Sequence, residues 1–273
     1  MKKSNITQVV ILSGGRGERL ISLTKNINKG MVKVARKPFL EHLIELFKAN
    51  GLKRFLILTG HAEESITEYL GSGKKFGVEI SYQHAPSALN HGARFARAIP
   101  LLDDFFVLHK NDIYWPFNLE KHLARFNELN VPSMMTVYRN KNKDGIYGPN
   151  NNVHINKKGL IERYDNRLSP DPFYHGQDIG FFLLKKQVVT ENLPLVVPDN
   201  FCLHHQFLSD LAEKGLLGAF ETNIPATTTT DVEWLQKAEK YFTSQTSTPR
   251  STQYAYLHKT ANEIPIKMVR RTS

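Results

Sequence analysis

The chain has 273 residues, of which 41% are apolar, and its formal net charge is +10 at pH 7. This length and apolar share suffice for one large or two small α/β domains with a hydrophobic core, which excludes a disordered or fibrous protein. The positive charge points to an anionic partner, such as a polyphosphate, a nucleic acid or an acidic lipid surface.

No apolar run in the sequence reaches the length of about 18 residues that a membrane span requires. The N-terminus is charged, but the apolar run behind it is short and ends in a glycine loop, so we expect no signal peptide. Cys202 is the single cysteine, which excludes an internal disulfide and suits a reducing compartment. We therefore expect a cytoplasmic protein without membrane association, in which Cys202 fills a buried apolar position.

Strand-like and helix-like patterns alternate along the chain. Buried strands are expected at 9–12, 54–60, 78–82, 105–108, 133–138 and 178–184. Helices are expected at 38–51, 62–70, 92–99, 117–128, 200–214 and 231–242. Residues 21–37 are polar and irregular, and residues 139–176 have the composition of loops with short hairpin strands. The alternation predicts an α/β fold, a three-layer α/β/α sandwich with a mostly parallel mixed sheet, whose functional residues lie at the carboxyl ends of the strands.

The first predicted strand ends in a cluster of three glycines. Gly14, Gly15 and Gly17 let the backbone turn sharply and let an anion approach bare N–H groups. Arg16 and Arg19 add guanidinium groups that suit phosphate. The Walker pattern is excluded because no Gly-Lys-Ser/Thr follows, and the dinucleotide fingerprint needs a third glycine where this chain has a leucine. We interpret the segment as a phosphate-holding loop, with a tight strand-to-helix turn as the alternative.

Three motifs follow one another at the start of the chain: LSGGRGERL at 12–20, NKGMV at 28–32 and KPFLEH at 37–42. Their order and spacing resemble those of the sugar-1-phosphate nucleotidyltransferases, which have Leu-Ala-Gly-Gly-x-Gly-Thr-Arg-Leu, then Pro-Lys-Pro-Met, then Lys-Pro-Φ-Leu-Glu-His. The resemblance runs from residue 8 to residue 243 and is strongest up to Ala85. The third motif is most similar in form to that of the mannose- and heptose-1-phosphate guanylyltransferases.

The resemblance implies a Rossmann-like fold of the GT-A type, in which residues 1–243 form a nucleotidyltransferase domain. Its nucleotide half would span 1–115 and its sugar half 116–243, followed by a polar basic tail or arm at 244–273. It also implies an enzyme with Mg²⁺ as cofactor that joins a nucleoside triphosphate, with GTP favoured, to a mannose- or heptose-type sugar 1-phosphate. The products would be pyrophosphate and a nucleotide sugar for polysaccharide synthesis. Homo-oligomer formation is left open.

The resemblance also assigns roles to individual residues. Arg19 and Lys29 would hold the triphosphate and stabilise charge in the transition state, and Asp112 would bind the magnesium ion. The nucleotide-binding residues would be Leu12, Ser13, Gly14, Gly15, Arg16, Gly17, Gln83 and Gly92. The sugar-binding residues would be Tyr147, Gly148, Asn166, Arg167, Asp178 and Gly180. Within these sets, the Gln83 amide would read a base edge and Arg167 would lie near the sugar phosphate.

The chain departs from the family pattern at several positions. Asn111 stands where the family has a glycine before the metal-binding aspartate, and Asn90 and His91 replace small residues of the base pocket. The family's second metal ligand, the Asp of Asp-Ile-Gly-Thr-Pro, has no counterpart, because the chain has threonines at 227–230. Asp231 is expected to cap the helix that follows.

These departures leave a second hypothesis open, a nucleotidyltransferase-like binding or regulatory subunit with weakened chemistry. Judged by residue type alone, Lys29 is a loop lysine, Arg19 a surface ion-pair residue and Asp112 a turn cap, and each sugar-side residue equally suits a turn or the surface. Nucleic-acid binding through the basic tail is a third hypothesis, less favoured than a nucleotide substrate. The eleven histidines show no His-Glu-x-x-His spacing, so we predict no zinc site.

Overall fold

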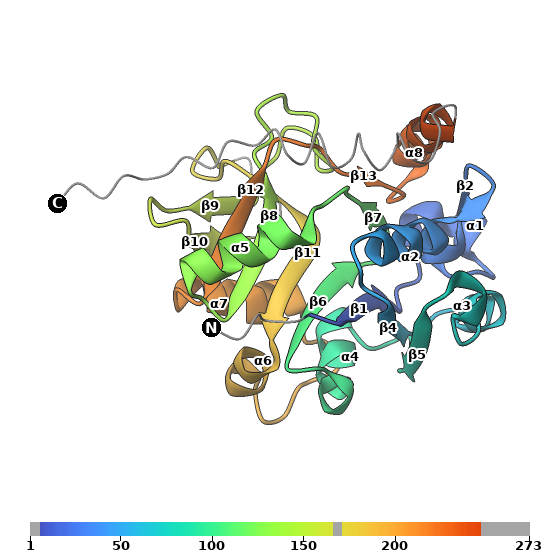
Figure 1. Ribbon diagram of the computed structural model, residues 1–273, viewed down its shortest axis with the longest axis horizontal. Coiled ribbons are helices and arrows are strands. Elements are labelled where there is room, and N and C mark those ends of the chain that lie inside the picture. The colour runs from blue at the N-terminus through green and yellow to red at the C-terminus, as the bar shows by residue number, and fades with distance from the viewer. Residues whose placement is uncertain (1–5, 166–170, 247–273) are drawn as a thin grey trace.

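The computed structural model describes residues 6–165 and 171–246, which Figure 1 shows arranged around one central sheet. The seven strands lie in the order β12 (Leu217–Thr222), β8 (Ser133–Tyr138), β11 (Gln177–Lys185), β6 (Phe105–Lys110), β1 (Gln8–Ser13), β4 (Arg54–Thr59) and β5 (Glu79–His84). Neighbouring strands are parallel except where β11 pairs with β6 and with β8. The prediction of a mostly parallel mixed sheet is confirmed.

Two hydrophobic clusters, one on each face of the sheet, produce the three layers. Successive side chains of a strand point to opposite faces, so that Val9 and Ile11 belong to one cluster and Val10 to the other. The first cluster takes apolar residues from α2 (Phe39–Ala49), α3 (Glu64–Leu70), α5 (Leu119–Leu129) and α8 (Val232–Thr246). The second takes them from α4 (His91–Arg97), α6 (Lys186–Asn192) and α7 (Ser209–Glu213). The three-layer α/β/α sandwich is therefore confirmed.

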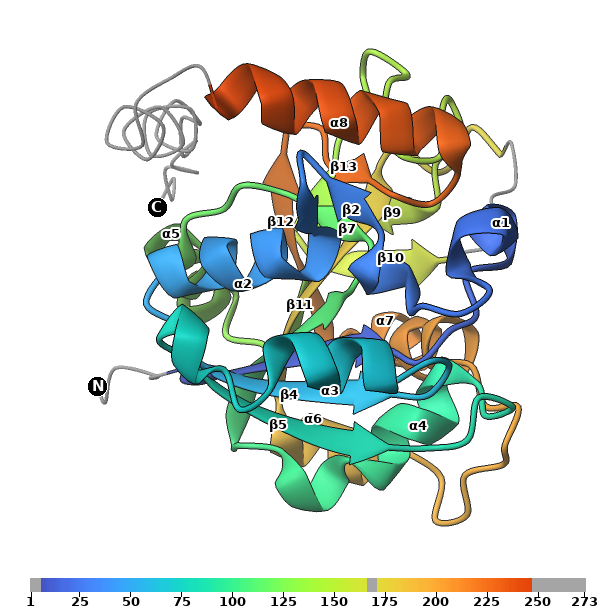
Figure 2. The ribbon, with the colours of Figure 1, turned by 90° about the vertical axis from the view of Figure 1, so that its right-hand side faces the viewer.

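Three short antiparallel ribbons supplement the sheet. The pairs are β2 (Lys33–Val34) with β3 (Lys37–Pro38), β7 (Ile113–Tyr114) with β13 (Thr227–Thr228), and β9 (Val153–Ile155) with β10 (Ile161–Tyr164). The β7–β13 ribbon brings the segment before α8 back beside the carboxyl end of β6. Figure 2 shows α8 lying above β13, on the side of α2. The ring of Phe242 in α8 packs there on His42 of α2, with 4.0 Å between the ring centroids.

Several elements differ from the predictions. The sequence does not predict the strand β12, the helix α6 and the β2–β3 and β7–β13 ribbons, because each is short and lacks a long apolar period. The β9–β10 ribbon agrees with the short hairpin strands expected within 139–176. The predicted start of the helix at 200–214 is wrong, since a π-helix, η5, begins only at Leu203 and runs to Leu208 before α7 follows. Before it, Asp199 and Asn200 form a turn, in which the Phe201 N–H donates to the Pro198 carbonyl at 2.9 Å and the Asn90 N–H donates to the Asp199 carbonyl at 2.9 Å. The predicted end is confirmed at Gly215, whose φ is +67°.

The predicted irregular stretch at 21–37 is ordered in short pieces. It holds α1 (Ile21–Thr24), a 3₁₀ turn at Lys29–Met31 and the β2–β3 ribbon. Further 3₁₀ turns lie at Glu18–Leu20, Lys74–Phe76 and Ile99–Leu101.

The first hydrophobic cluster runs from Ile6 to Phe242 and so includes residues of both predicted halves. The division of the chain into a nucleotide half and a sugar half stays a prediction. Of the tail predicted at 244–273, the first residues belong to α8, which ends at Thr246, and residues 247–273 lie outside the described residues. In the part of the chain that the structure describes, no helix combines the length and the apolar character needed to cross a membrane.

Two core histidines make the stability of the fold depend on pH. Burial lowers the pKa of His109 in β6 and of His122 in α5 to about 4. The usual value is about 6.5, so between pH 6.5 and pH 4 the unfolded chain binds more protons than the folded one. The contribution of these two histidines to the free energy of unfolding should therefore be fully present above pH 6.5. It should fall as the pH drops toward 4.

The substitution His122→Gln removes one of these titrating groups. The slope of the free energy of unfolding against pH should then decrease by about 1.4 kcal/mol per pH unit between pH 4 and 6.5. Urea unfolding at a series of pH values measures this slope. An unaltered slope in His122→Gln would show that His122 titrates alike in the folded and unfolded states.

Candidate active site

The side chain of Asn28 joins three segments at the carboxyl edge of the sheet. Its Nδ2 donates to the carbonyl of Ser13, at the end of β1, at 2.7 Å and to the carbonyl of His61, after β4, at 3.0 Å. Its Oδ1 accepts from the Ser13 hydroxyl at 3.0 Å, from the Gly30 N–H at 3.0 Å and from Asn111 Nδ2, after β6, at 3.1 Å. Asn28 is buried, and a buried amide without partners is costly, so this network fixes the three strand ends relative to one another.

The network places Lys29 beside Asp112. Lys29 Nζ lies 2.6 Å from Asp112 Oδ2 and 3.3 Å from Thr230 Oγ1. The segment of Asp112 is held on β1, where the carbonyl of Leu12 accepts the Asn111 N–H at 3.3 Å. Burial alone would raise the pKa of the Asp112 carboxyl, but the charge and the hydrogen bond of Lys29 outweigh burial and the pKa is lowered. The structure therefore brings two of the three predicted catalytic residues together and keeps the carboxylate ionised.

The glycine loop follows β1 directly. Gly17 has a φ of +66°, in the left-handed region that favours glycine, and it caps the turn at Glu18–Leu20. Gly15 is exposed, and a side chain there would meet nothing within 4 Å. Arg16 and Arg19 are exposed as well, and neither pairs with a carboxylate among the described residues. Both guanidinium groups are therefore open to an anion.

Arg94 of α4 lies beneath this loop and was not predicted as a site residue. It is 2% exposed, its Nη2 donates to the Pro86 carbonyl at 3.0 Å, and its Nε has no hydrogen-bond partner in the described part of the chain. Burial lowers the pKa of its guanidinium. A Cβ on Gly14 would lie 2.1 Å from Arg94 Cζ, and one on Gly60 would lie 2.8 Å from Nη2. An arginine on the buried face of a helix is the sequence signal that indicates such a residue.

Two other predicted nucleotide residues have contacts of their own. Gln83, near the end of β5, donates from Nε2 to the His84 carbonyl at 2.9 Å, while its Oε1 is buried without a partner among the described residues. A Cβ on Gly92 would lie 2.5 Å from the carbonyl oxygen of Phe201, so packing of α4 explains this glycine. Binding of a nucleotide by Gln83 and Gly92 stays a prediction.

A second polar cluster surrounds Lys110 at the end of β6. Lys110 Nζ lies 3.1 Å from Asp178 Oδ2, and the Tyr164 hydroxyl donates to the same oxygen at 2.8 Å. Burial disfavours the charge on Lys110, but the Asp178 carboxylate outweighs it and raises the pKa of the ammonium. Burial raises the pKa of Tyr164 and of Tyr147, so both keep their hydroxyl protons. A Cβ on Gly180, whose φ is +71°, would lie 2.9 Å from Lys110 Cδ, so this glycine makes room for the lysine.

Three of the predicted sugar-side residues, Tyr147, Asp178 and Gly180, are thus gathered around a lysine and a tyrosine that were not predicted. Gly148 lies nearby, since its carbonyl accepts from Gln177 Nε2 at 2.8 Å. Asn166 and Arg167 lie outside the described residues.

The threonine run before α8 borders Asp112, as the β7–β13 ribbon requires. The Thr228 hydroxyl donates to the Asp112 carbonyl at 2.6 Å, and the Thr229 N–H donates to the same oxygen at 3.0 Å. Asp231 faces the other way, because its Oδ1 accepts the Trp234 N–H at 2.9 Å. The expectation that Asp231 caps the last helix is confirmed, and its carboxylate is therefore engaged away from Asp112.

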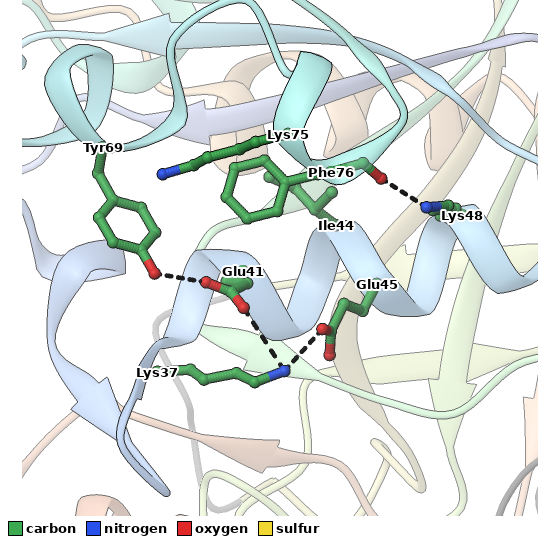
Figure 3. Close-up of a pocket in the computed structure, with 8 residues that line it drawn as sticks. All are labelled: Lys37, Glu41, Ile44, Glu45, Lys48, Tyr69, Lys75 and Phe76. Carbon is green, nitrogen blue, oxygen red and sulfur yellow. Dashed lines mark hydrogen bonds and ion pairs between the residues drawn. The ribbon is translucent and has the colours of Figure 1, made fainter. Parts of the chain in front are cut away.

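A hollow of 460 Å³ on the outer side of α2 offers no alternative site. It is lined by Lys37, Glu41, Ile44, Glu45, Lys48, Tyr69, Lys75 and Phe76 (Figure 3). Lys37 Nζ lies 3.5 Å from Glu41 and 2.6 Å from Glu45, and the Tyr69 hydroxyl donates to Glu41 at 2.6 Å. The carboxylates of the hollow are thus satisfied within it, and it contains none of the predicted site residues.

Comparisons with known proteins relate the chain to one family. A family model described as nucleotidyl transferase matches residues 8–193. The low-salt glycan biosynthesis nucleotidyltransferase Agl11 of Haloferax volcanii is 41% identical over 106 residues, which are 38% of this chain and 29% of that protein. The D-glycero-α-D-manno-heptose 1-phosphate guanylyltransferase of Campylobacter jejuni is 25% identical over 185 residues, 67% of this chain and 78% of that protein. The crystal structure of HddC from Yersinia pseudotuberculosis has a TM-score of 0.72 at 20% identity, over 87% of this chain and 100% of that one.

The mixed sheet, with a glycine loop and a carboxylate at its carboxyl edge, has the Rossmann-like, GT-A-type fold of nucleotidyltransferases. The chain belongs to the nucleotidyl transferase family, and its predicted membership of the sugar-1-phosphate nucleotidyltransferases is confirmed. The match to the archaeal relative spans 29% of that protein's length. The likeness to the Yersinia structure, at 20% identity, shows the fold alone.

Two neighbouring glycines allow a direct test of the packing beneath the loop. Gly14→Ala should lower the free energy of unfolding by about 1–3 kcal/mol, because the new methyl group displaces the buried guanidinium of Arg94. Gly15→Ala, which points into open space, should change it by less than about 0.5 kcal/mol. Urea unfolding measures both values, and an Arg94→Ala background should remove most of the cost of Gly14→Ala. Equal costs for the two alanines would contradict the described contact.

Proposed function

We propose that the protein is a sugar-1-phosphate nucleotidyltransferase. An oxygen of the sugar phosphate attacks the α-phosphorus of a nucleoside triphosphate and forms a new P–O bond. The bond from the α-phosphorus to the oxygen that bridges to the β-phosphate breaks, and pyrophosphate leaves. The protein has to align two anionic substrates and neutralise their charge, without a covalent intermediate. The observation that carries the proposal is the Lys29–Asp112 pair, which Asn28 holds at the same sheet edge as the open glycine loop.

The glycine loop suits the triphosphate. Its N–H groups and the exposed guanidinium groups of Arg16 and Arg19 offer charge-assisted hydrogen bonds to phosphate oxygens. Lys29 carries a compact charge on a flexible stem, so that its ammonium can turn from Asp112 to a phosphate oxygen and stabilise the charge that develops in the transition state. Arg94, beneath the loop, adds a fixed positive charge close to the same backbone.

The residues around Asp112 fit a magnesium ion held largely by the substrate. Mg²⁺ is commonly bound through one or two carboxylates together with substrate phosphates and water. Asp112 supplies an ionised carboxylate, and the threonine run beside it supplies only hydroxyl and backbone groups. A bound magnesium ion would neutralise triphosphate charge. Alignment of the substrates falls to Lys29 and the glycine loop.

For substrates we favour GTP and a mannose- or heptose-type sugar 1-phosphate, used for polysaccharide synthesis in the cytoplasm. The form of the KPFLEH motif supports this choice, as does similarity to a Campylobacter protein named as a heptose 1-phosphate guanylyltransferase. The Lys110 cluster offers donors and acceptors for sugar hydroxyls from Asp178, Tyr147 and Tyr164. Arg167 is the proposed partner of the sugar phosphate.

A panel of nucleoside triphosphates and sugar 1-phosphates, with Mg²⁺ present, tests the reaction through release of pyrophosphate. We expect the highest kcat/KM with GTP and a mannose- or heptose-type phosphate. Lys29→Ala and Asp112→Asn should each lower kcat by about 10²–10³-fold, because each removes charge stabilisation from the transition state.

Lys33→Ala is the matched control, because Lys33 is an exposed lysine four positions along the chain and should leave kcat nearly unchanged. Thermal unfolding of each variant separates lost chemistry from lost folding. If no pair of substrates releases pyrophosphate, the protein is not a nucleotidyltransferase of this kind.

The threonine run at 227–230 favours a second candidate, a nucleotide-binding regulatory subunit. A hydroxyl is a much poorer magnesium ligand than the carboxylate that the family has before its last helix, and Lys29 already neutralises Asp112. Calorimetry distinguishes the candidates, because binding of a nucleoside triphosphate without any turnover would support the regulatory role.

A further inference from the structure

Three side chains that commonly bind transition metals meet where the start of α4 packs against the segment that enters η5. His91 is the first residue of α4, and Cys202 and His204 flank the start of η5. Nε2 of His91 lies 2.7 Å from Nδ1 of His204 and 3.7 Å from Sγ of Cys202. One ligand atom from each residue lies within 4.8 Å of the other two. In the described ranges, 6–165 and 171–246, this is the only such group of three His, Cys, Asp or Glu donors.

Backbone contacts hold the two segments together independently of these side chains. A Cβ on Gly92 would lie 2.5 Å from the Phe201 carbonyl oxygen and 2.6 Å from the Leu203 nitrogen, so the two backbones touch where only a glycine fits. The Asn90 N–H donates to the Asp199 carbonyl at 2.9 Å. The three donors are therefore presented by a rigid junction, and a ligand that binds them needs no rearrangement of the chain.

One histidine of the cluster has a ring nitrogen without a partner. His204 Nδ1 faces His91, and Nε2, the other nitrogen of the same ring, is buried and has no hydrogen-bond partner among the described residues. The hydrogen bonds of the described residues therefore do not satisfy both nitrogens of this ring.

We propose that His91, Cys202 and His204 bind one zinc ion and leave its fourth position open. Two imidazoles and a thiolate are ligands that Zn²⁺ prefers and that Mg²⁺ avoids. Two ligand atoms on a tetrahedral zinc ion lie about 3.3–3.6 Å apart, given bond lengths of about 2.0–2.3 Å. The distances of 2.7 and 3.7 Å come within small side-chain shifts of those values.

Zinc here would tie α4 to η5. The proposal does not rest on the transfer reaction, since none of the three ligands belongs to the proposed catalytic residues. No helical spacing marks this cluster, because His91 is 111 positions from Cys202 and 113 from His204. This proposal departs from the prediction, made from the sequence, that the chain has no zinc site.

The first test uses the full chain, stripped with a chelator, dialysed, and kept in excess Mg²⁺ so that hard oxygen sites are filled. Calorimetry with Zn²⁺ alone should show one equivalent bound with a dissociation constant of about 1 μM or tighter. Co²⁺ as a probe should give the visible bands of a tetrahedral site and a near-ultraviolet thiolate band. Absence of stoichiometric Zn²⁺ binding overturns the proposal.

A second measurement needs no variant, because Cys202 is the single cysteine of the chain. The rate of its reaction with an aromatic disulfide reagent reports on this thiol alone. Zn²⁺ should slow that reaction at least tenfold, and the chelator should restore it. A rate that Zn²⁺ leaves unchanged overturns the proposal even if zinc binds elsewhere on the surface.

The variants Cys202→Ser and His204→Ala should each weaken Zn²⁺ binding by at least tenfold and abolish the cobalt spectrum. His205→Ala is the matched control, since His205 is the next residue but its Nδ1 faces Asp165 at 3.8 Å, and it should bind zinc as the parent does. Zn²⁺ should raise the thermal unfolding temperature of the parent chain and of His205→Ala, and not that of Cys202→Ser. Equal zinc binding by His204→Ala and His205→Ala would overturn the assignment.

Discussion

The buried amide of Asn28 sets the geometry on which the proposed activity depends. Its side chain donates hydrogen bonds to the backbone after β1 and β4 and accepts them from side chains after β1 and β6. The ends of these three parallel strands are therefore fixed relative to one another. Lys29 follows Asn28 directly in the chain, and Asp112 follows Asn111. Fixing the two asparagines therefore places the Asp112 carboxylate beside the Lys29 ammonium. Ordering this network costs little conformational freedom, since each member is already part of a strand end or a tight turn.

Much of the fold could be read from the sequence, for identifiable physical reasons. The strands β1, β4 and β6 are buried on both faces and read as continuous apolar runs, and α2 shows a clear helical period. The elements that the sequence predicts wrongly or not at all share a cause: contacts with residues distant in the sequence determine their local structure. Leu217–Thr222 is a strand because β8 lies beside it, although a glycine interrupts its pattern. Asn200 lies in a turn and Cys202 is extended, although the sequence predicts a helix there, because the backbone and the side chain of Asn90 donate to the carbonyls of Asp199 and Asn200. No local propensity describes these contacts.

The site was predictable where chain order and sheet topology suffice. Lys29 and Asp112 follow strands that are adjacent in the sheet, so their meeting follows from the alternation of strands and helices. The sequence does not single out Arg94 and Lys110, because their positions look like ordinary helix and strand residues. Only the fold shows that each side chain packs against a glycine. The cluster of His91, Cys202 and His204 forms where two segments distant in the sequence meet. A motif of fixed spacing, such as His-Glu-x-x-His, cannot detect it. Asp231 was correctly assigned as a cap, since its chemistry is local.

The packing of α8 on α2 has a consequence for how the chain matures. Phe242 lies between Phe39, His42 and Tyr114, and Glu239 Oε2 accepts the Ala35 N–H at 2.7 Å. The start of α2 is therefore covered by an apolar side chain of α8, the last helix of the described residues. During synthesis, a nascent chain that has emerged as far as β6 exposes this apolar surface of α2 until α8 has been synthesised. Exposed apolar surface makes a partly synthesised chain prone to misassociation, so among the described elements α8 is the one that covers this surface.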